Sequence, residues 1–394
     1  MNTTTRNAGL PDLMQMLQSQ HARKHDIVVN ATAIRSDNAT LTVTGAEQQI
    51  DLDGVTAVDG RYVPTRVADE GIASKLNIPL AYLRRLRDER PDLYDANVNA
   101  WLHGANARGE WVQHPSGDYG FTEHRPAVDP DSRKFLLRTF KGDDGQPGIA
   151  RALLSDRYGV VDNLDVLMAA LDGVRDAGVA VDITGGDLTD RRMVVRVACP
   201  EVQALAPALL RGYRSPFTGQ SGDDNPTVFA GFQLSNSETG GGAFTITPRL
   251  IVQVCNNGMT ITKDALREIH LGGRMDEGVI RWTEDTQRKS LDLVKARTRD
   301  AVATFLDTDY LIRVIERAES KASTEVPTVE DVTKIGRAAG YTQEQVDGIL
   351  GYFVKGGQMT LGGVMNAATA YAQTVTDGDA AHDIEARATA LLGV

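Results

Sequence analysis

A run of cations follows a strand-like segment near the middle of the chain. Arg267, His270 and Arg274 come after the sequence VCNNGM, whose Asn-Gly step is typical of a tight hairpin turn or of a corner between a strand and a helix. Guanidinium groups gathered on one side of a sheet would neutralise phosphate groups, which is the main requirement for binding a nucleic acid. An upstream segment, which we expect to form a hairpin that turns at its Gly-Gly step, adds three more cations: Arg191, Arg192 and Arg196.

Aromatic side chains accompany other cations. The segment RGYRSPF places Arg214 beside Tyr213, and RALLSDRY ends on a tyrosine. A flat ring for stacking, combined with phosphate neutralisation, is what a single-stranded nucleic acid needs. The alternative is a solvated surface on which each cation pairs with a carboxylate. The predicted nucleic-acid-binding residues are Arg151, Arg157, Tyr158, Arg191, Arg192, Arg196, Arg214, Arg267, His270 and Arg274.

Metal and nucleophile chemistry find less support in the sequence. His21 and His25 stand four residues apart on a predicted helix, but no third ligand is signalled nearby. The segment QLSNSETGGG matches neither a nucleophile elbow nor a phosphate-binding loop, and its glycines suit a bend between strands. We therefore expect no metal and no cofactor. Enzymatic activity stays open but is not favoured, and the carboxylates that a metal-dependent nuclease would use are Asp156, Asp182, Asp187 and Glu238.

Both helices and strands are expected to position these residues. Helical spacing marks the segments around residues 10–24, 65–102 and 164–178, whereas alternating apolar residues mark strands before, between and after them. Helical patterns dominate from about residue 281 onward. This order predicts the α+β class, with a mostly antiparallel central sheet flanked by helices and an all-helical C-terminal region.

Three regions are expected from the changes in pattern. A polar, glycine-rich interval between residues 103 and 131 marks the first boundary. The predicted regions are an N-terminal α+β region with a helix pair (1–130), a central antiparallel-sheet domain (131–319) and a C-terminal helical domain (320–394).

Composition limits the class of protein. The chain has 394 residues and a net charge of -11, which favours solubility and argues against a uniformly basic coat for nucleic acid. Its two cysteines, Cys199 and Cys255, cannot form a disulfide framework. No apolar run approaches the length of a membrane span, and the first residues lack the apolar core of a signal peptide. We expect a cytoplasmic protein without membrane contact.

Several segments together resemble the phage/plasmid-like domain-of-unknown-function family nine hundred and thirty-two. They are, in order, IPLAYLRRL, RALLSDRYGVVDNLDVL, FQLSNSETGGGAFTITPRLIVQVCNNGM, REIHLGG and LGGVMNAATAYAQ. Bacteriophages, prophages and conjugative elements carry this family, so the resemblance implies a mobile-element protein in the cytoplasm of a bacterial host. Such genes often lie near replication and recombination functions. The order of elements in the middle of the chain is also loosely similar to that of phage strand-annealing proteins.

Two functions are therefore expected from the sequence. The first is a protein that binds or anneals single-stranded DNA in recombination or replication, acting as a homo-oligomer. The alternative is a protein-interaction factor that modulates a host component without binding nucleic acid. In that case the acidic helices after residue 320 would form the contact surface.

Overall fold

The computed structural model describes most of the chain. The described residues are 3–45, 49–51, 54–56, 59–104, 109–113, 116–117, 119–123, 130–143, 145–156, 158, 160–255, 257–267 and 284–393. The chain divides into two compact units. Unit 1 contains Met1–Leu17, Val160–Leu271 and Arg281–Val394, and unit 2 is built mainly from Gln18–Gly159.

The two units differ from the three regions predicted from the sequence. Strands β10 (Lys134–Phe140) and β11 (Gly148–Ser155) pair with β2 (Lys24–Asn30) and β7 (Gly60–Pro64), so they lie in unit 2 although we expected them in the central domain. The helices after residue 320 share one hydrophobic core with the central sheet and lie in unit 1. Strand pairing is made by backbone hydrogen bonds, which leave no signal in either segment alone.

Unit 1 is organised around an antiparallel sheet with a long central meander. Its strands, in spatial order, are β1 (Thr5–Ala8), β12 (Asp182–Leu188), β13 (Met193–Leu205), β14 (Thr227–Asn236), β15 (Thr245–Val252) and β16 (Asn257–Thr260), and β17 (Leu266–Arg267) also pairs with β15. The strand at the amino end of the chain thus pairs with one more than 170 residues later. The prediction of an α+β protein with a mostly antiparallel central sheet is confirmed.

Side chains along the central strands alternate between two faces, as the pleat of a strand requires. On β13, Val195 and Val197 are buried in the hydrophobic core, and Arg196 between them lies on the opposite face. On β14, Phe232 and Leu234 flank Gln233 in the same way. Each buried valine, leucine or phenylalanine stabilises the fold by about 1.5–3 kcal/mol, so the apolar face holds the sheet in place.

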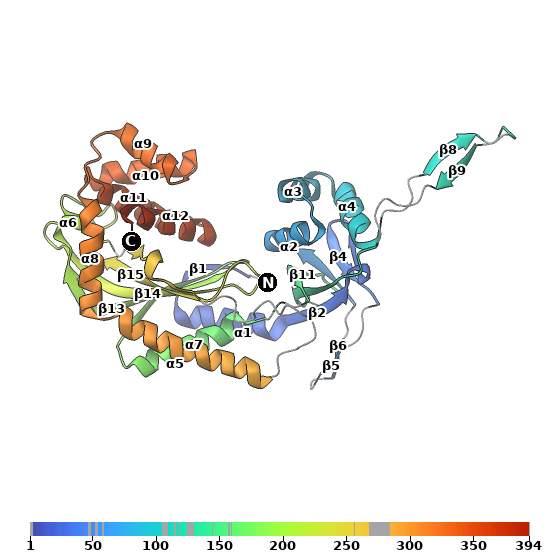
Figure 1. Cartoon of the computed structure of the whole chain (residues 1–394), viewed down its shortest axis with the longest axis horizontal. Helices are drawn as coiled ribbons and strands as arrows, with labels where there is room; N and C mark the ends of the chain where they lie inside the picture. Colours follow the sequence, from blue (N-terminus) through green and yellow to red (C-terminus); the bar gives the residue numbers. More distant parts are fainter. Residues whose placement is uncertain are drawn as a thin grey trace. The chain divides into compact units, whose positions relative to one another are not determined.

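Helices cover both faces of the unit 1 sheet. In Figure 1, α5 and α7 run along one face, and α11 and α12 lie on the other, where they contact β16. The prediction of an all-helical C-terminal region is confirmed. The helices of unit 1 are α5 (Asn163–Ala177), α6 (Pro207–Leu210), α7 (Glu284–Phe305), α8 (Thr308–Ala322), α9 (Val329–Ala338), α10 (Gln343–Gly356), α11 (Leu361–Thr374) and α12 (Gly378–Leu392), with the short 3-10 turn η2 (Thr262–Asp264).

The hairpin of β12 and β13 turns at a different place from the one predicted. We expected the turn at the Gly-Gly step, but Gly185 and Gly186 lie within β12, and the chain turns at 189–192. A Cβ atom on Gly186 would lie 2.6 Å from the side chain of Leu13 in α1 (Leu10–Arg23). The absence of a side chain at Gly186 therefore lets Leu13 of α1 pack closely against β12.

Unit 2 has its own sheet in the order β2-β10-β11-β7-β4-β3, antiparallel except between β7 and β11. Helix α2 packs on β11, where a Cβ atom on Gly71 would lie 2.5 Å from the Leu153 carbonyl oxygen. The remaining elements of this part of the chain are the 3-10 turn η1 (Ala31–Ala33), β3 (Ile34–Asp37), β4 (Thr40–Val43), β5 (Gln49–Asp51), β6 (Gly54–Thr56), α2 (Arg66–Leu76), α3 (Leu80–Glu89), α4 (Pro91–His103), β8 (Gly109–Gln113) and β9 (Tyr119–Glu123).

Candidate ligand-binding face of the unit 1 sheet

The second face of the unit 1 sheet is polar, although helices cover it. We call it the polar face, and its main members are Arg196, Gln233, Thr247, Arg249 and Thr260. Arg196 lies opposite Gln233, and Gln233 lies opposite Thr247 on the next strand. Arg249 lies opposite Thr260. Directly paired residues have Cβ atoms about 4.5–5.5 Å apart, so the polar face presents adjoining rows of hydrogen-bonding groups.

A cavity of about 450 Å³ opens on this face. We call it the arginine cavity, and the residues lining it include Arg6, Arg196, Phe229, Arg249, Gly258 and Glu385. Its volume is within the range of small-molecule sites, about 300–1,000 Å³. Its three arginines come from β1, β13 and β15, so the fold brings together residues that are far apart in the sequence.

One carboxylate in this region serves two of the arginines. Asp187, which is only 2% exposed, accepts hydrogen bonds from the guanidinium groups of Arg6 and Arg196 and from the backbone N–H of Asn7. Burial by itself would raise the pKa of Asp187, but the hydrogen bond and charge of Arg196 outweigh burial and lower it. Asp187 is therefore ionised, and two positive charges share one negative charge.

Arg249 is less completely paired. Its side chain is 5% exposed, and its nearest carboxylate is Glu385, with 3.5 Å between Nη2 and Oε2. The Arg249 Nε and the Glu385 Oε2 have no hydrogen-bond partner among the described residues. Burial lowers the pKa of Arg249 to about 10, which leaves the guanidinium charged at neutral pH. A buried cation with an unused donor therefore faces the arginine cavity.

Gly258 of the VCNNGM segment makes room for this arginine. A Cβ atom at Gly258 would lie 1.8 Å from Nη2 of Arg249, closer than any two such atoms can approach. The Asn-Gly step does not form the turn itself, because Asn257 and Gly258 already belong to β16, and the chain turns just before them. The glycine is required for space beside Arg249.

A second cavity, of about 350 Å³, opens on the polar face. We call it the hydroxyl cavity, and the residues lining it include Arg192, Gln233, Thr247, Thr260, Thr262 and His382. Gln233 Oε1, Thr260 Oγ1 and His382 Nδ1 are buried and have no hydrogen-bond partner among the described residues. Burial and the nearby charge of Arg192 lower the pKa of His382 to about 4, so its ring is neutral at physiological pH.

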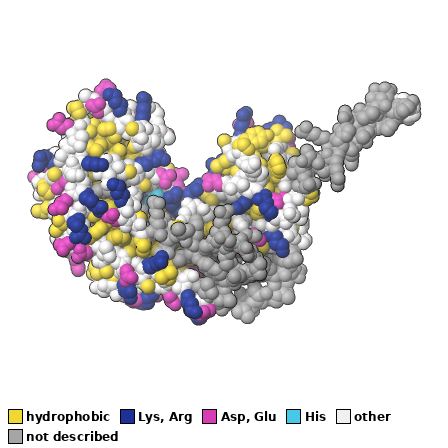
Figure 2. Space-filling model, viewed as in Figure 1, with side chains coloured by type: hydrophobic (Ala, Val, Ile, Leu, Met, Phe, Trp, Pro, Cys, Tyr) yellow, Lys and Arg dark blue, Asp and Glu magenta, His cyan; other side chains and the backbone are white. Residues whose placement is uncertain are grey.

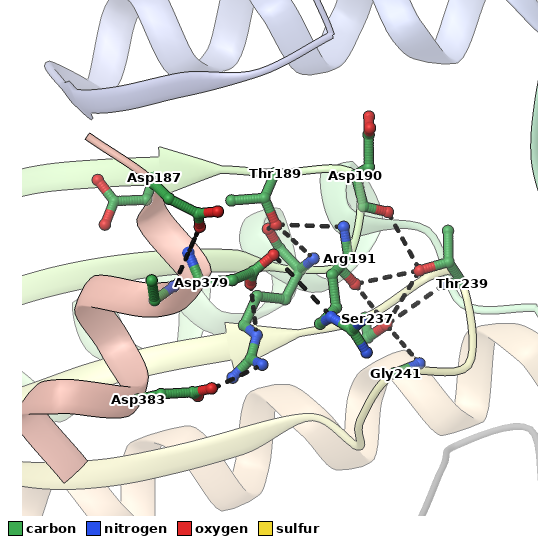
Figure 3. Close-up of polar contacts among 12 residues, drawn as sticks. Asp187, Thr189, Asp190, Arg191, Ser237, Thr239, Gly241, Asp379 and Asp383 are labelled. Atoms are coloured by element: carbon green, nitrogen blue, oxygen red, sulfur yellow. Dashed lines mark hydrogen bonds and ion pairs between the residues drawn. The ribbon is translucent and has the colours of Figure 1, made fainter. Parts of the chain in front are cut away.

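Two segments lie against the turn between β12 and β13: helix α12 and the glycine-rich loop 237–244, which joins β14 to β15. Figure 3 shows Asp379 and Asp383 directed from α12 toward this turn, where they pair with Arg192 at 2.8 Å and 3.7 Å. In the loop after β14, the hydroxyl of Ser237 donates to the Arg191 carbonyl oxygen at 2.6 Å and accepts from the Gly241 N–H. Gly240, the first glycine of this loop, has φ of 83°, as the prediction of a bend requires.

The predicted cations are distributed over both units. Arg191, Arg192 and Arg196 lie together at one end of the unit 1 sheet, where each is within 4.0 Å of a carboxylate. Arg151 lies in unit 2, buried against the Phe140 ring with 4.2 Å between the guanidinium carbon and the ring centroid. Tyr158 also lies in unit 2, and its backbone N–H donates to the Ser155 carbonyl oxygen.

The remaining predicted residues are Arg157, Arg214, Arg267, His270 and Arg274. Arg214 is exposed and donates to the Gly219 carbonyl oxygen at 2.8 Å. Arg267 ends β17 opposite Thr245, and its side chain is outside the described part of the chain. Arg157, His270 and Arg274 lie outside the described residues altogether. Figure 2 shows basic and acidic side chains interspersed on the visible surface of unit 1.

Sequence reasoning missed Arg6, Arg249 and Glu385. Arg249 is a single cation directly before the apolar run LIV, and Glu385 follows Ile384 on the buried side of α12. A charge beside an apolar run is the available signal, because a buried charge requires a partner or a function. Nothing in the sequence near Arg6 reveals that it joins them.

Aromatic rings form a row near Arg214. Phe217 is 45% exposed and lies 5.8 Å from Tyr352, whose ring centroid is 6.5 Å from that of Tyr371. Lys355 stands over Tyr352 at 5.2 Å. We call Phe217, Tyr352 and Tyr371 the aromatic row. Such a surface offers ring faces beside positive charge.

The carboxylates considered for a nuclease do not gather at one point. Asp187 pairs with arginines, Glu238 Oε1 accepts from the Asn163 N–H, and Asp156 lies in unit 2 beside Ser155. Among the described residues, no group of three or more His, Cys, Asp or Glu side chains could hold a metal ion.

No family model, curated protein or solved structure matches this chain. Within the described residues, no helix combines the length and the apolar composition needed to cross a bilayer.

Proposed function

We propose that unit 1 binds single-stranded DNA, with a phosphate group of the strand held in the arginine cavity. The observation that carries the proposal is Arg249, a buried guanidinium whose Nε has no partner among the described residues and whose nearest carboxylate is 3.5 Å away. A phosphate oxygen is a strong acceptor for such a donor. The bond would form at a site already closed to most water, where it is stronger than at the surface.

The charges around the cavity support an anionic ligand. Three guanidinium groups, those of Arg6, Arg196 and Arg249, face two buried carboxylates, Asp187 and Glu385. Asp182 also lines the cavity, but it is exposed, so solvent screens its charge. The three guanidinium groups, of which that of Arg6 is partly exposed, and the two buried carboxylates therefore leave an excess of one positive charge.

Aromatic groups support a strand rather than a simple anion. Phe229 lines the arginine cavity and can contact a base or sugar. The aromatic row of unit 1 adds ring faces with Lys355 beside them. Stacking of a base on an aromatic ring contributes about 1–3 kcal/mol and tolerates any base. We further propose that this binding serves strand annealing during phage recombination, as the family resemblance implies.

Titration of a fluorescent oligonucleotide, followed by anisotropy at several salt concentrations, tests binding. The wild-type chain should bind, and its affinity should fall as salt rises because phosphate contacts release counterions. Arg249→Met should weaken binding at least about tenfold. Arg66→Met, which removes an exposed arginine of unit 2 that pairs with Asp88, serves as the control and should leave affinity unchanged. Undetectable binding at low salt, or equal affinities of wild type and Arg249→Met, would contradict the proposal.

A protein partner is the second candidate. Val354 is 65% exposed and Met359 is 47% exposed, near the C-terminal end of α10. Deleting residues 320–394 cannot test this candidate, because α11 is buried in the core of unit 1. Val354→Glu keeps the core intact. If capture of a host protein survives nuclease treatment and is lost in Val354→Glu, the second candidate is favoured over DNA.

A further inference from the structure

The hydroxyl cavity contains buried polar atoms without a bonding partner. Gln233 and Thr260 are each 2% exposed, yet Gln233 Oε1 and Thr260 Oγ1 have no hydrogen-bond partner among the described residues. Nδ1 of His382 is a third such atom. These residues come from β14, β16 and α12, and all three line the cavity. Buried polar atoms in folded proteins are nearly always bonded, so three of them around one cavity call for a ligand or for ordered water.

The charges around the cavity favour a neutral ligand. Arg192 lines it, but Asp379 and Asp383 pair with that guanidinium. No carboxylate is among the described residues that line the cavity, so an ammonium group would have no direct counter-ion. The His382 imidazole is uncharged at neutral pH, because burial lowers its pKa. A phosphate or an amine is therefore a poor match, since either charge would be buried without an unpaired charge of the opposite sign.

Hydroxyl groups and methyl groups make up most of the remaining lining. The hydroxyl groups are those of Ser235, Ser237, Thr245, Thr247, Thr260 and Thr262. The methyl groups belong to three alanines and to the threonines. No phenyl, phenol or indole ring is among the described residues that line the cavity, so a flat aromatic ligand has no such ring to stack on. This lining favours a compact ligand that forms hydrogen bonds in several directions.

Neighbouring hydroxyl groups on a ligand would satisfy the three unbonded atoms. Gln233 Oε1 can only accept a hydrogen bond, so the ligand must donate to it. The Thr260 hydroxyl can donate or accept, and Nδ1 of the neutral His382 ring does one or the other according to its tautomer. A hydroxyl group donates one hydrogen bond and accepts two, so a pair of them carries enough donors and acceptors for all three atoms. An amide divides these roles between its nitrogen and its oxygen, so it matches the group of atoms less well.

We propose that the hydroxyl cavity binds a small neutral polyol, meaning a sugar or a cyclic polyol with neighbouring hydroxyl groups, through Gln233, Thr260 and His382. The cavity volume of about 350 Å³ is at the lower end of the range for small-ligand sites, about 300–1,000 Å³. Two of the three residues lie on the sheet and the third on α12, so the ligand would bridge this helix to the sheet. The inference goes beyond the proposed function, because it concerns a second cavity and a ligand without phosphate.

Saturation-transfer NMR of the full chain with D-ribose, D-glucose and myo-inositol tests the inference. Acetamide is the comparison ligand, because it has N–H donors and no hydroxyl group. At least one of the three polyols should bind saturably and about tenfold more tightly than acetamide, the difference that one hydrogen bond makes. Binding has to be measured directly, since sugars stabilise most proteins merely by being excluded from the protein surface.

Two conservative variants connect this binding to the cavity. Thr260→Val keeps the shape of the side chain and removes the unbonded hydroxyl, and Gln233→Met removes the unbonded carbonyl oxygen. Each should weaken polyol binding about tenfold, while the midpoint of urea unfolding of the free protein stays the same or rises, because no hydrogen bond is lost. Gln203→Met is the matched control, since Gln203 is an exposed glutamine on β13 of the same sheet, and it should change neither quantity.

The outcomes are clear in both directions. Saturable polyol binding that both variants weaken and that Gln203→Met retains supports the inference. Absence of binding by all three polyols means that the cavity holds only water, and it overturns the inference. Tighter binding of acetamide, or polyol binding that is unchanged in both variants, overturns it as well. No oligonucleotide takes part in these titrations, so a negative result leaves the DNA-binding proposal in place, and failure of that proposal leaves this one in place.

Discussion

The two sheets each contain a buried arginine, and the two differ in how completely they are bonded. In unit 2, Arg138 is 0% exposed, and its Nε and Nη2 donate to both oxygens of Asp26 at 2.9–3.2 Å. In unit 1, Arg249 reaches Glu385 only at 3.5 Å and keeps an unused Nε donor beside a cavity. A fully bonded ion pair serves the fold, whereas an incompletely bonded one can bind a ligand.

The largest effect is expected at the fully bonded pair. Arg138→Met should lower the stability of unit 2 by about 3–5 kcal/mol, because Asp26 loses its partner. Arg249→Met should cost less, since it breaks one long contact. Hydrogen exchange measured by mass spectrometry follows strands β10 and β14 separately and checks both. Equal losses of protection in the two variants would remove the distinction between the two arginines.

Gly258→Ala tests whether the position of the Arg249 guanidinium depends on the space that Gly258 leaves in β16. Its new Cβ atom must displace the Arg249 guanidinium, so stability should fall by about 1–3 kcal/mol and DNA affinity should fall with it. The double variant Gly258→Ala/Arg249→Met should recover most of the stability but none of the affinity. Urea unfolding and anisotropy measure the two quantities. Additive stability losses in the double variant would show that the two residues do not interact.

Acid should weaken unit 1 through His382. The pKa of His382 in the folded protein is lowered to about 4, below the ordinary value of 6.5, so the unfolded chain takes up the proton first as pH falls. The stability that neutral His382 contributes is present above about pH 6.5 and is lost as pH falls toward 4. Between pH 7 and 5 the loss should be about 1–2 kcal/mol. His382→Gln should flatten this part of the pH profile, and an unchanged slope would exclude His382 as the cause.

The smallest predicted effect belongs to the aromatic row. Tyr352→Ala should weaken oligonucleotide binding by about 1 kcal/mol, or roughly fivefold, since one ring face is lost. Tyr82→Ala is the matched control, because Tyr82 is an exposed tyrosine in α3 of unit 2. Anisotropy at constant salt measures both. If both variants bind as wild type does, then the row takes no part in binding.

Local features of the fold could be predicted from the sequence. Gly178 ends α5 in the left-handed conformation with φ of 70°, and the Thr328 hydroxyl caps α9 by accepting from the Asp331 N–H. Both signals involve residues a few positions apart, which is the range over which sequence patterns act. The pairing of β1 with β12 and of β7 with β11 could not be predicted, because it joins segments remote in the chain.

The candidate site was predicted only in part, for the same reason. Arg196 was selected because it lies in a recognisable hairpin, but its counter-ion Asp187 was considered only as a metal ligand. Arg249 was passed over as one charge in an apolar strand. Its importance depends on Gly258 and Glu385, which reach it through the register of β16 and the packing of α12.

Arg6 ties the short strand β1 to the rest of unit 1. Besides Asp187, its guanidinium donates to the carbonyl oxygens of Ala372 and Val375 at the end of α11. A protease that cuts after Ala8 would thus remove one wall of the arginine cavity together with an edge strand of the sheet. Fusion tags or labels at the amino end need a spacer long enough to leave the hydrogen bonds of Arg6 intact.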